Sequence, residues 1–119
     1  MVRLVMEGKR KEIWAITDRS DTFEEFFHDL DQESDKRKIT RLCERFVEHG
    51  PPRNTQKFRK LAGSVWEMKP TAQIRLLGGW DPRNDRRFII SHAIRKKSRR
   101  PRQREIDKAE RRLRQEIGE

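Results

Sequence analysis

The chain has 119 residues, of which 32% are hydrophobic and 42% are charged, and its formal net charge is +10. One domain over residues 1–119 fits this length, and three tryptophans and six phenylalanines exclude a wholly disordered chain, because aromatic side chains bury much area per residue. No apolar run reaches the ~18 residues of a membrane helix, so we expect no membrane contact and no secretory leader. Cys43 is the only cysteine, so we expect no internal disulfide and a cytoplasmic location.

The first fifty residues predict a strand followed by two helices. Residues 12–17 alternate as a strand does, and residues 1–11 either pair with them as an extra strand or form a flexible extension. A first helix begins at Thr22, which fits a capping box with Glu25. A second helix has apolar residues three and four positions apart and ends at Gly50, and the two helices form a hairpin that packs on a sheet.

Three short alternating runs predict further strands, at residues 64–70, 73–80 and 86–94. Their connections are too short for a crossover, so we expect antiparallel neighbours. Gly78 and Gly79 indicate a bulge or a strand end, and a last helix begins near Pro101. Together these elements predict an α+β fold, with a small antiparallel sheet, an N-terminal helical hairpin packed on it and a C-terminal helix.

Four alternating residues of the last predicted strand would share one face: Phe88, Ile90, His92 and Ile94. The other face of this strand is apolar as well, so periodicity leaves open which face is buried. His92 is therefore open to two interpretations, a buried structural histidine or a catalytic one.

The positive charge is concentrated in the second half of the chain. Residues 1–50 carry 10 Lys and Arg against 12 Asp and Glu, a net charge of −2. Residues 51–91 carry 9 against 3 and residues 92–119 carry 11 against 5, a net charge of +6 for each. Seven bases lie between Arg95 and Arg104, where the last strand gives way to the last helix. This asymmetry favours a polyanionic partner, of which nucleic acid is the commonest.

The pattern of reactive residues favours phosphate chemistry without a metal or a cofactor. The three histidines are scattered and the single cysteine completes no metal-binding pair. The alternation instead places Glu67 and Lys69 on an open face of the sheet, along with Arg75 or its neighbours from the next strand. Fixed Lys and Arg cations can stabilise the charge that develops on a phosphate during RNA cleavage, and a Glu, a His or a lysine of lowered pKa can transfer protons. The plain alternative is that these charges only solvate the sheet.

Two stretches carry a family resemblance. FRKLAGSVWEMK (58–69) fits a Phe-x-x-Leu-x-Gly-x-x-Trp-Glu-x-Arg signature, with a lysine at its last position. HAIRKKSRRPRQREIDKAERRL (92–113) fits a His-x-Phe-x-Lys-Lys motif followed by a basic helix, with an isoleucine in place of the phenylalanine. Both motifs, in this order, resemble the RelE/HigB-like toxins of type II toxin–antitoxin systems, in their phage-derived branch.

The resemblance implies a RelE-like fold and a toxin that acts as a metal-independent endoribonuclease, cleaves mRNA in association with the ribosome and inhibits translation. It also implies a helix-turn-helix antitoxin as partner, with the toxin monomeric alone and oligomeric in the complex. Two alternatives stay open because a fold does not fix a function: a basic nucleic-acid-binding module without catalysis, and a gyrase inhibitor similar to ParE.

Carried over position by position, the resemblance gives two sets of candidate residues. The candidate catalytic residues are Glu67, Lys69, Arg75, His92, Lys96 and Lys97. The candidate RNA-binding residues are Arg59, Lys60, Arg95, Arg99 and Arg100. RelE itself has a tyrosine near its C-terminus as acid or base, but this sequence contains no tyrosine. The identity of the general acid and base is therefore open.

Overall fold

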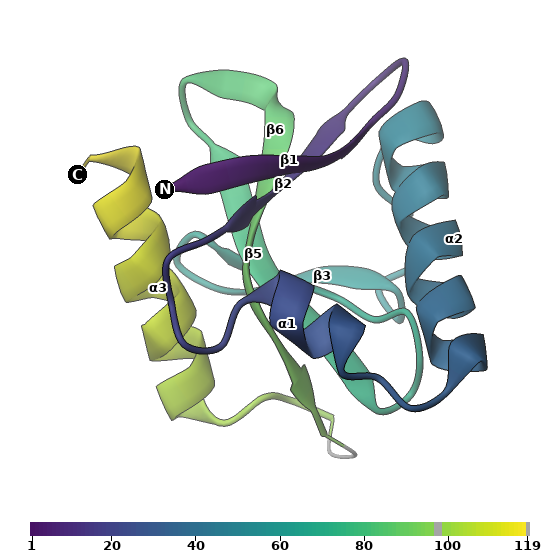
Figure 1. Ribbon diagram of the computed structural model, residues 1–119. Helices are drawn as coiled ribbons and strands as arrows, with labels where there is room; N and C mark the ends of the chain where they lie inside the picture. Colours follow the sequence, from purple (N-terminus) through teal and green to yellow (C-terminus); the bar gives the residue numbers. More distant parts are fainter. Residues whose placement is uncertain (97–98, 119) are drawn as a thin grey trace.

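A six-stranded sheet lies at the centre of the computed structural model, which describes residues 1–96 and 99–118 (Figure 1). The strands are β1 (Val2–Glu7), β2 (Glu12–Ile16), β3 (Phe58–Ala62), β4 (Val65–Met68), β5 (Ile74–Asp81) and β6 (Asn84–Arg95). They lie in the order β1-β2-β6-β5-β4-β3, and all neighbours are antiparallel except β2 and β6, which are parallel. The α+β class is confirmed, but the sheet is larger than predicted and is not purely antiparallel.

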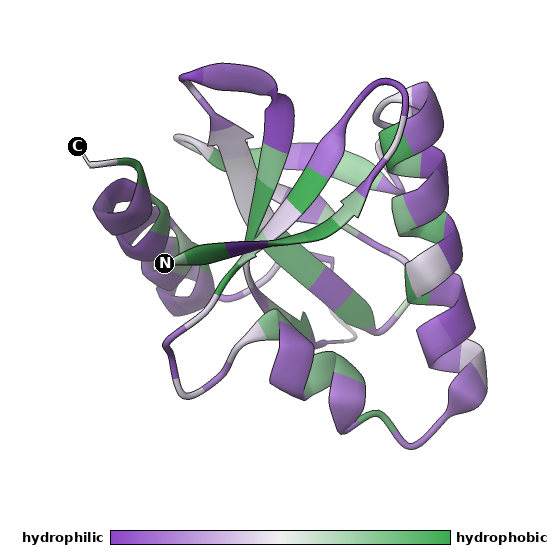
Figure 2. Ribbon diagram, turned by 45° about the horizontal axis from the view of Figure 1, so that its top comes forward, coloured by the Kyte–Doolittle hydropathy of each residue, from purple (hydrophilic) through white to green (hydrophobic). Residues whose placement is uncertain are grey.

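Helices cover both faces of this sheet. Helices α1 (Phe23–His28) and α2 (Glu33–His49) pack on one face, and α3 (Gln103–Ile117) packs on the other. Figure 2 shows that the hydrophobic residues of α2 and α3 lie toward the sheet and the hydrophilic ones away from it. The predicted C-terminal helix is present. No helix in the described ranges is both long enough and apolar enough to cross a membrane.

The N-terminus differs from the prediction, because the chain begins with a β-hairpin rather than with a helical hairpin. Strand β1 pairs with β2, with Val2 opposite Ile16, so Val2–Glu7 adds a strand before the two helices. The extra-strand interpretation of this segment is confirmed. The turn of the hairpin lies against α2, where a Cβ at Gly8 would come within 2.7 Å of the Val47 backbone. Only glycine allows so close an approach.

The local signals of the two helices act as the sequence predicts. The side-chain oxygen of Thr22 accepts a hydrogen bond from the backbone N–H of Glu25 at 3.2 Å and caps α1. Helix α2 ends at His49, and Gly50 follows with φ of 90°. Strand β3 was not predicted, because its residues do not alternate: the bases Arg59 and Lys60 are adjacent, and so are the apolar residues Leu61 and Ala62. It lies at the edge of the sheet and pairs with β4.

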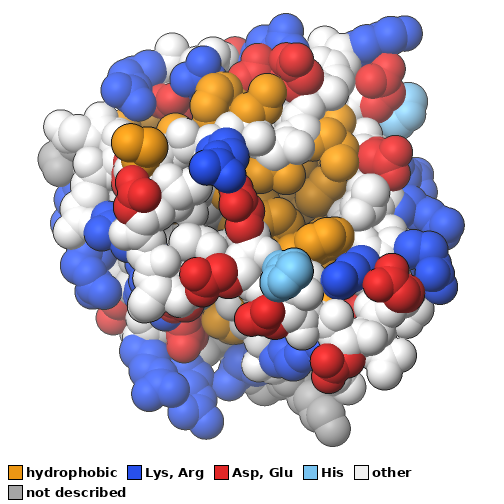
Figure 3. All heavy atoms as spheres, in the orientation of Figure 1, with side chains coloured by type: hydrophobic (Ala, Val, Ile, Leu, Met, Phe, Trp, Pro, Cys, Tyr) orange, Lys and Arg blue, Asp and Glu red, His pale blue; other side chains and the backbone are white. Residues whose placement is uncertain are grey.

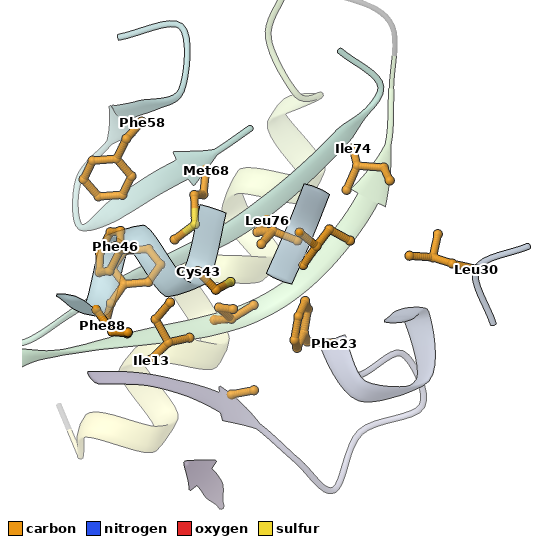
Figure 4. Close-up of a cluster of buried hydrophobic side chains, with 14 residues drawn as sticks. Ile13, Phe23, Leu30, Cys43, Phe46, Phe58, Met68, Ile74, Leu76 and Phe88 are labelled. Carbon is orange, nitrogen blue, oxygen red and sulfur yellow. The ribbon is translucent and has the colours of Figure 1, made fainter. Parts of the chain in front are cut away.

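The core has one part on each face of the sheet. Between the sheet and α2, the rings of Phe46, Phe58 and Phe88 pack against one another (Figure 4). Beneath α3, a second cluster includes Leu77 and Ile106. Because both faces are covered, β6 is apolar on both sides, which explains why periodicity could not select one buried face.

A β-bulge divides β6 into two parts that face differently. Gly78 lies opposite Ile90, whereas Leu77 lies opposite His92, so Ser91 is an extra residue in β6. The predicted irregularity at the paired glycines is confirmed. One extra residue reverses the facing of everything that follows. The expectation that His92 shares the face of Ile90 is therefore wrong: Ile90 packs under α2, and His92 lies under α3.

Candidate functional site

The candidate site lies at the end of the sheet where β4 stops and β5 begins, on the face covered by α3. Strand pairing places Arg59 opposite Glu67, and the end of β4 lies beside the start of β5. Lys96 follows β6 directly, and its backbone N–H donates to the carbonyl of Gln73 at 2.6 Å. We define the basic corner as Arg59, Glu67, Lys69, Arg75, Lys96 and Arg99.

Glu67 is the centre of the basic corner and is completely buried, with an exposed fraction of 0%. Its Oε1 accepts a hydrogen bond from Arg59 Nε at 2.9 Å, and its Oε2 accepts one from Arg75 Nη1 at 3.0 Å. The expectation of an open face is wrong for this residue: its side chain is buried, and the two arginines on its carboxylate also bond the carbonyl of Arg99. A buried carboxylate is stable only when it is paired in this way. The carboxylate of Glu67 therefore holds the guanidinium groups of Arg59 and Arg75 in place.

Arg75 is nearly as buried as its partner, with an exposed fraction of 2%. Its Nη2 donates to the Ala72 carbonyl at 3.3 Å and its Nη1 to the Arg99 carbonyl at 3.4 Å. The same Arg99 carbonyl accepts a hydrogen bond from Arg59 Nη2. The segment before α3 is thus fastened to the sheet by two arginines from different strands.

Lys69 is the half-buried ammonium of the basic corner. Burial lowers the pKa of Lys69, and the positive charge of Arg75 lowers it further, while Glu67 partly opposes the shift. Lys69 forms no ion pair with any residue that the structure describes. A lysine of lowered pKa beside a fixed cation is suited to proton transfer and to binding a phosphate.

His92 is buried beneath α3, with an exposed fraction of 1%. Its Nε2 lies 3.0 Å from Glu105 Oε1, and its Nδ1 lies 2.9 Å from Ser91 Oγ. Burial, together with the charge of Lys108, lowers the pKa of His92 to about 4 against the opposing effect of Glu105. The imidazole is thus neutral near pH 7, and both ring nitrogens are engaged within the fold.

The remaining candidates lie at the surface around the basic corner. Lys60, Arg95, Arg99 and Arg100 are exposed, whereas Arg59 and Lys96 are partly buried. Two of the exposed residues have partners in the fold: Arg95 Nη2 lies 3.6 Å from Asp35 Oδ2, and Arg100 Nη2 donates to the Leu61 carbonyl at 3.1 Å. Lys97 lies outside the described residues.

A second group of bases was missed in the sequence. Helix α2 and the segments 50–57 and 70–72 enclose a cleft of about 760 Å³, and its basic lining residues are Lys38, Arg41, Arg45, His49 and Lys57. We call it the basic cleft. Figure 3 shows Lys and Arg side chains gathered over α2 at the right edge of the molecule. Lys38, Arg41 and Arg45 are three and four residues apart, a spacing that predicts a basic stripe on one side of a helix. This stripe was overlooked because residues 1–50 have a net charge of −2.

The described part of the chain contains no cluster of three or more His, Cys, Asp or Glu side chains that could hold a metal ion.

Comparison with known families agrees with the two motifs that flank the site. Residues 25–114 match the family model described as Phage derived protein Gp49-like (DUF891). This span includes the whole basic corner and both motifs. None of the curated proteins matches the chain. The chain therefore belongs to the phage-derived Gp49-like family, a family of RelE/HigB-like toxins associated with toxin–antitoxin systems, and such a toxin implies an antitoxin as its partner.

Proposed function

We propose that this protein is the toxin of a type II toxin–antitoxin pair, with a RelE-like fold, and that it cleaves mRNA at the ribosome and thereby inhibits translation. The family association supports the toxin role. The observation that carries the nuclease role is Lys69, whose pKa is lowered beside the buried guanidinium of Arg75. In this proposal the cations of the basic corner supply the electrostatic stabilisation, and no metal ion is required.

The proposed reaction is transesterification within the RNA. The 2′-oxygen attacks the adjacent phosphorus, the bond between phosphorus and the 5′-oxygen breaks, and the products are a 2′,3′-cyclic phosphate and a 5′-hydroxyl. The proton of the 2′-hydroxyl passes to water, and the ammonium of Lys69 donates a proton to the leaving 5′-oxygen. Because the pKa of Lys69 is lowered, its ammonium is a stronger acid than that of an ordinary lysine.

The other residues of the basic corner receive different roles according to their exposure. Arg59 is 32% exposed on its side chain, and we assign it, with Lys96, to contact the phosphate. Glu67 and Arg75 are buried, so we assign them as positioning residues that hold Arg59 and set the charge around Lys69. His92 has no part in this reaction, because α3 covers it.

The test is cleavage of a fluorescent mRNA fragment by purified protein, with and without ribosomes, in buffer containing EDTA. We expect Lys69→Met to lower the cleavage rate by about 10²–10⁴-fold, the usual contribution of a general acid. Binding of a non-cleavable DNA copy of the fragment should stay within a few-fold of the parent protein. Arg111→Ala is the matched control, because Arg111 is an exposed base on α3 without an ion pair to any described residue.

Two outcomes would favour the alternatives. Salt-sensitive binding of RNA without cleavage, with and without ribosomes, would assign the protein as a nucleic-acid-binding module. Inhibition of DNA supercoiling by gyrase, with intact RNA, would assign it as similar to ParE.

A further inference from the structure

The basic cleft has the composition of an anion-binding site. Its volume of about 760 Å³ falls in the range of ~300–1,000 Å³ typical of ligand sites. Its basic residues come from α2 and from the segment before β3, and no acidic residue lines it. Leu42 and the three prolines Pro51, Pro52 and Pro70 supply apolar walls. Positive charge and apolar surface are therefore combined in one concave site.

The cations of the basic cleft are not neutralised within the fold. Lys38, Arg41, Arg45 and Lys57 form no ion pair with any residue in the described ranges. Lys38, Arg41 and Arg45 lie on one side of α2, because they are three and four residues apart. The stripe from Lys38 to Arg45 extends about 10 Å along the helix axis, at 1.5 Å per residue. A ligand with repeated negative charges could contact several of these bases at once.

The basic cleft is joined to the basic corner by two direct hydrogen bonds. The carbonyl of Lys57, in the cleft wall, accepts the backbone N–H of Lys69 at 2.8 Å. The carbonyl of Ala72, also in the wall, accepts Arg75 Nη2 at 3.3 Å. The turn from Pro70 to Ala72 is thus the common border of the two sites. We expect a polyanion bound at Lys69 to reach the cleft across this turn.

We propose that the basic cleft binds the nucleotides that flank the cleavage position of a single-stranded RNA, with phosphates on the bases of α2 and nucleobases on the apolar wall. This inference rests on the proposed function of the basic corner. An acidic protein segment would satisfy the same charges, but it would not require the continuity with Lys69. The cleft therefore extends the RNA contact beyond the reacting phosphate and determines the length of RNA that the protein prefers.

The experiment measures binding of fluorescent single-stranded oligonucleotides by polarisation over a range of salt concentrations. The probes are 2′-O-methyl RNAs, which cannot be cleaved, of about four and about twelve nucleotides, within the usual site sizes of single-strand binders. The test protein is the double variant Arg41→Ala/Arg45→Ala. The matched control is Arg10→Ala/Arg111→Ala, which removes the same charge from exposed arginines outside the cleft and without ion pairs to described residues. Circular dichroism verifies that each variant is folded.

We expect the parent to bind the longer probe more tightly than the shorter one, and the cleft variant to lose most of this advantage. The slope of log affinity against log salt for the longer probe should fall by about 1.4, since each lost phosphate contact on a single strand contributes ~0.7. The control variant should retain both the length preference and the slope. In cleavage assays the cleft variant should raise KM for long RNA and leave kcat nearly unchanged, because it removes uniform binding.

Equal behaviour of the cleft and control variants would overturn the inference while leaving the nuclease proposal intact. A second result would also overturn the inference: the parent binds an Asp- and Glu-rich peptide, and the cleft variant loses this binding but binds RNA as the parent does. That result would assign the cleft to a protein partner. In a third outcome, the parent does not cleave RNA, but it still prefers the longer probe and the cleft variant loses this preference. In that case the nuclease proposal fails and the cleft remains an RNA site.

Discussion

Replacement of Glu67 by glutamine tests whether the buried carboxylate holds the basic corner together. The carboxylate of Glu67 is fully buried and accepts hydrogen bonds from Arg59 and Arg75 at 2.9 and 3.0 Å. Glutamine has nearly the same shape, but its amide group offers one acceptor oxygen, and its NH₂ group meets a guanidinium donor. The guanidinium of Arg75, 2% exposed, is then left without its counter-charge.

The expected loss of stability is large because the guanidinium of Arg75 is buried and cannot be rehydrated easily. Removal of one partner from a buried ion pair typically costs about 3–5 kcal/mol. The exposed part of Arg59 can reach water, so we expect a value near the lower end, about 3 kcal/mol. With the slope of ~1–3 kcal/mol/M usual for urea unfolding of small proteins, this corresponds to a midpoint lower by about 1–3 M.

The assay is urea unfolding, followed by the fluorescence of the three tryptophans and by circular dichroism. The control is Glu110→Gln, which removes the surface pair of Glu110 Oε1 with Arg114 Nη2 at 3.5 Å and should cost less than about 0.5 kcal/mol. The double variant Glu67→Gln/Arg75→Met should be more stable than the sum of the single variants by about 1–3 kcal/mol. Equal midpoints for Glu67→Gln and Glu110→Gln would refute the organising role of Glu67.

Three further predictions concern pH and the partner. His92 has a pKa of about 4 in the folded protein and ~6.5 when unfolded, so the unfolded chain takes up its proton first. Stability should therefore fall by about 3 kcal/mol as the pH decreases from about 6.5 to about 4, and His92→Gln should remove most of this dependence from urea midpoints. The cleavage rate of the parent should decline at alkaline pH as Lys69 loses its proton. Lys69→Arg should be slow at every pH and should not show this decline, because arginine keeps the charge but cannot donate a proton; a parent rate that does not decline at alkaline pH would exclude Lys69 as the acid. Co-expression with the neighbouring gene should yield a complex that survives moderate salt, and a toxin that purifies alone and stays toxic would contradict the pairing.

Local rules predicted the parts of the fold that depend on neighbouring residues. The capping residue Thr22, the helix stop at Gly50 and the irregularity at Gly78 each follow from the chemistry of a few adjacent positions. The parallel pairing of β2 with β6 could not be predicted in this way, because it joins segments about 70 residues apart. Apolar residues on both sides of β6 were the available sign of a sheet covered on both faces, but that pattern alone does not say which helix covers which face.

In the candidate site, too, local patterns predicted which residues are present, but not which of them are buried by distant parts of the chain. Charge and alternation gave Glu67, Lys69 and Arg75 as candidates, on a face that was expected to be open. The Arg99 carbonyl, which bonds Arg59 and Arg75 over this face, comes from a part of the chain that follows β6. This long-range cover separates cations of similar chemistry by burial: Arg75 is buried, whereas Arg59 and Lys69 are partly exposed. In a low-dielectric setting the buried Arg75 acts on the lysine more strongly than an exposed cation would. Burial is the main cause of the lowered pKa of Lys69 and the charge of Arg75 is the second, so changes that expose Lys69 to water should raise this pKa even when they leave Lys69 itself untouched.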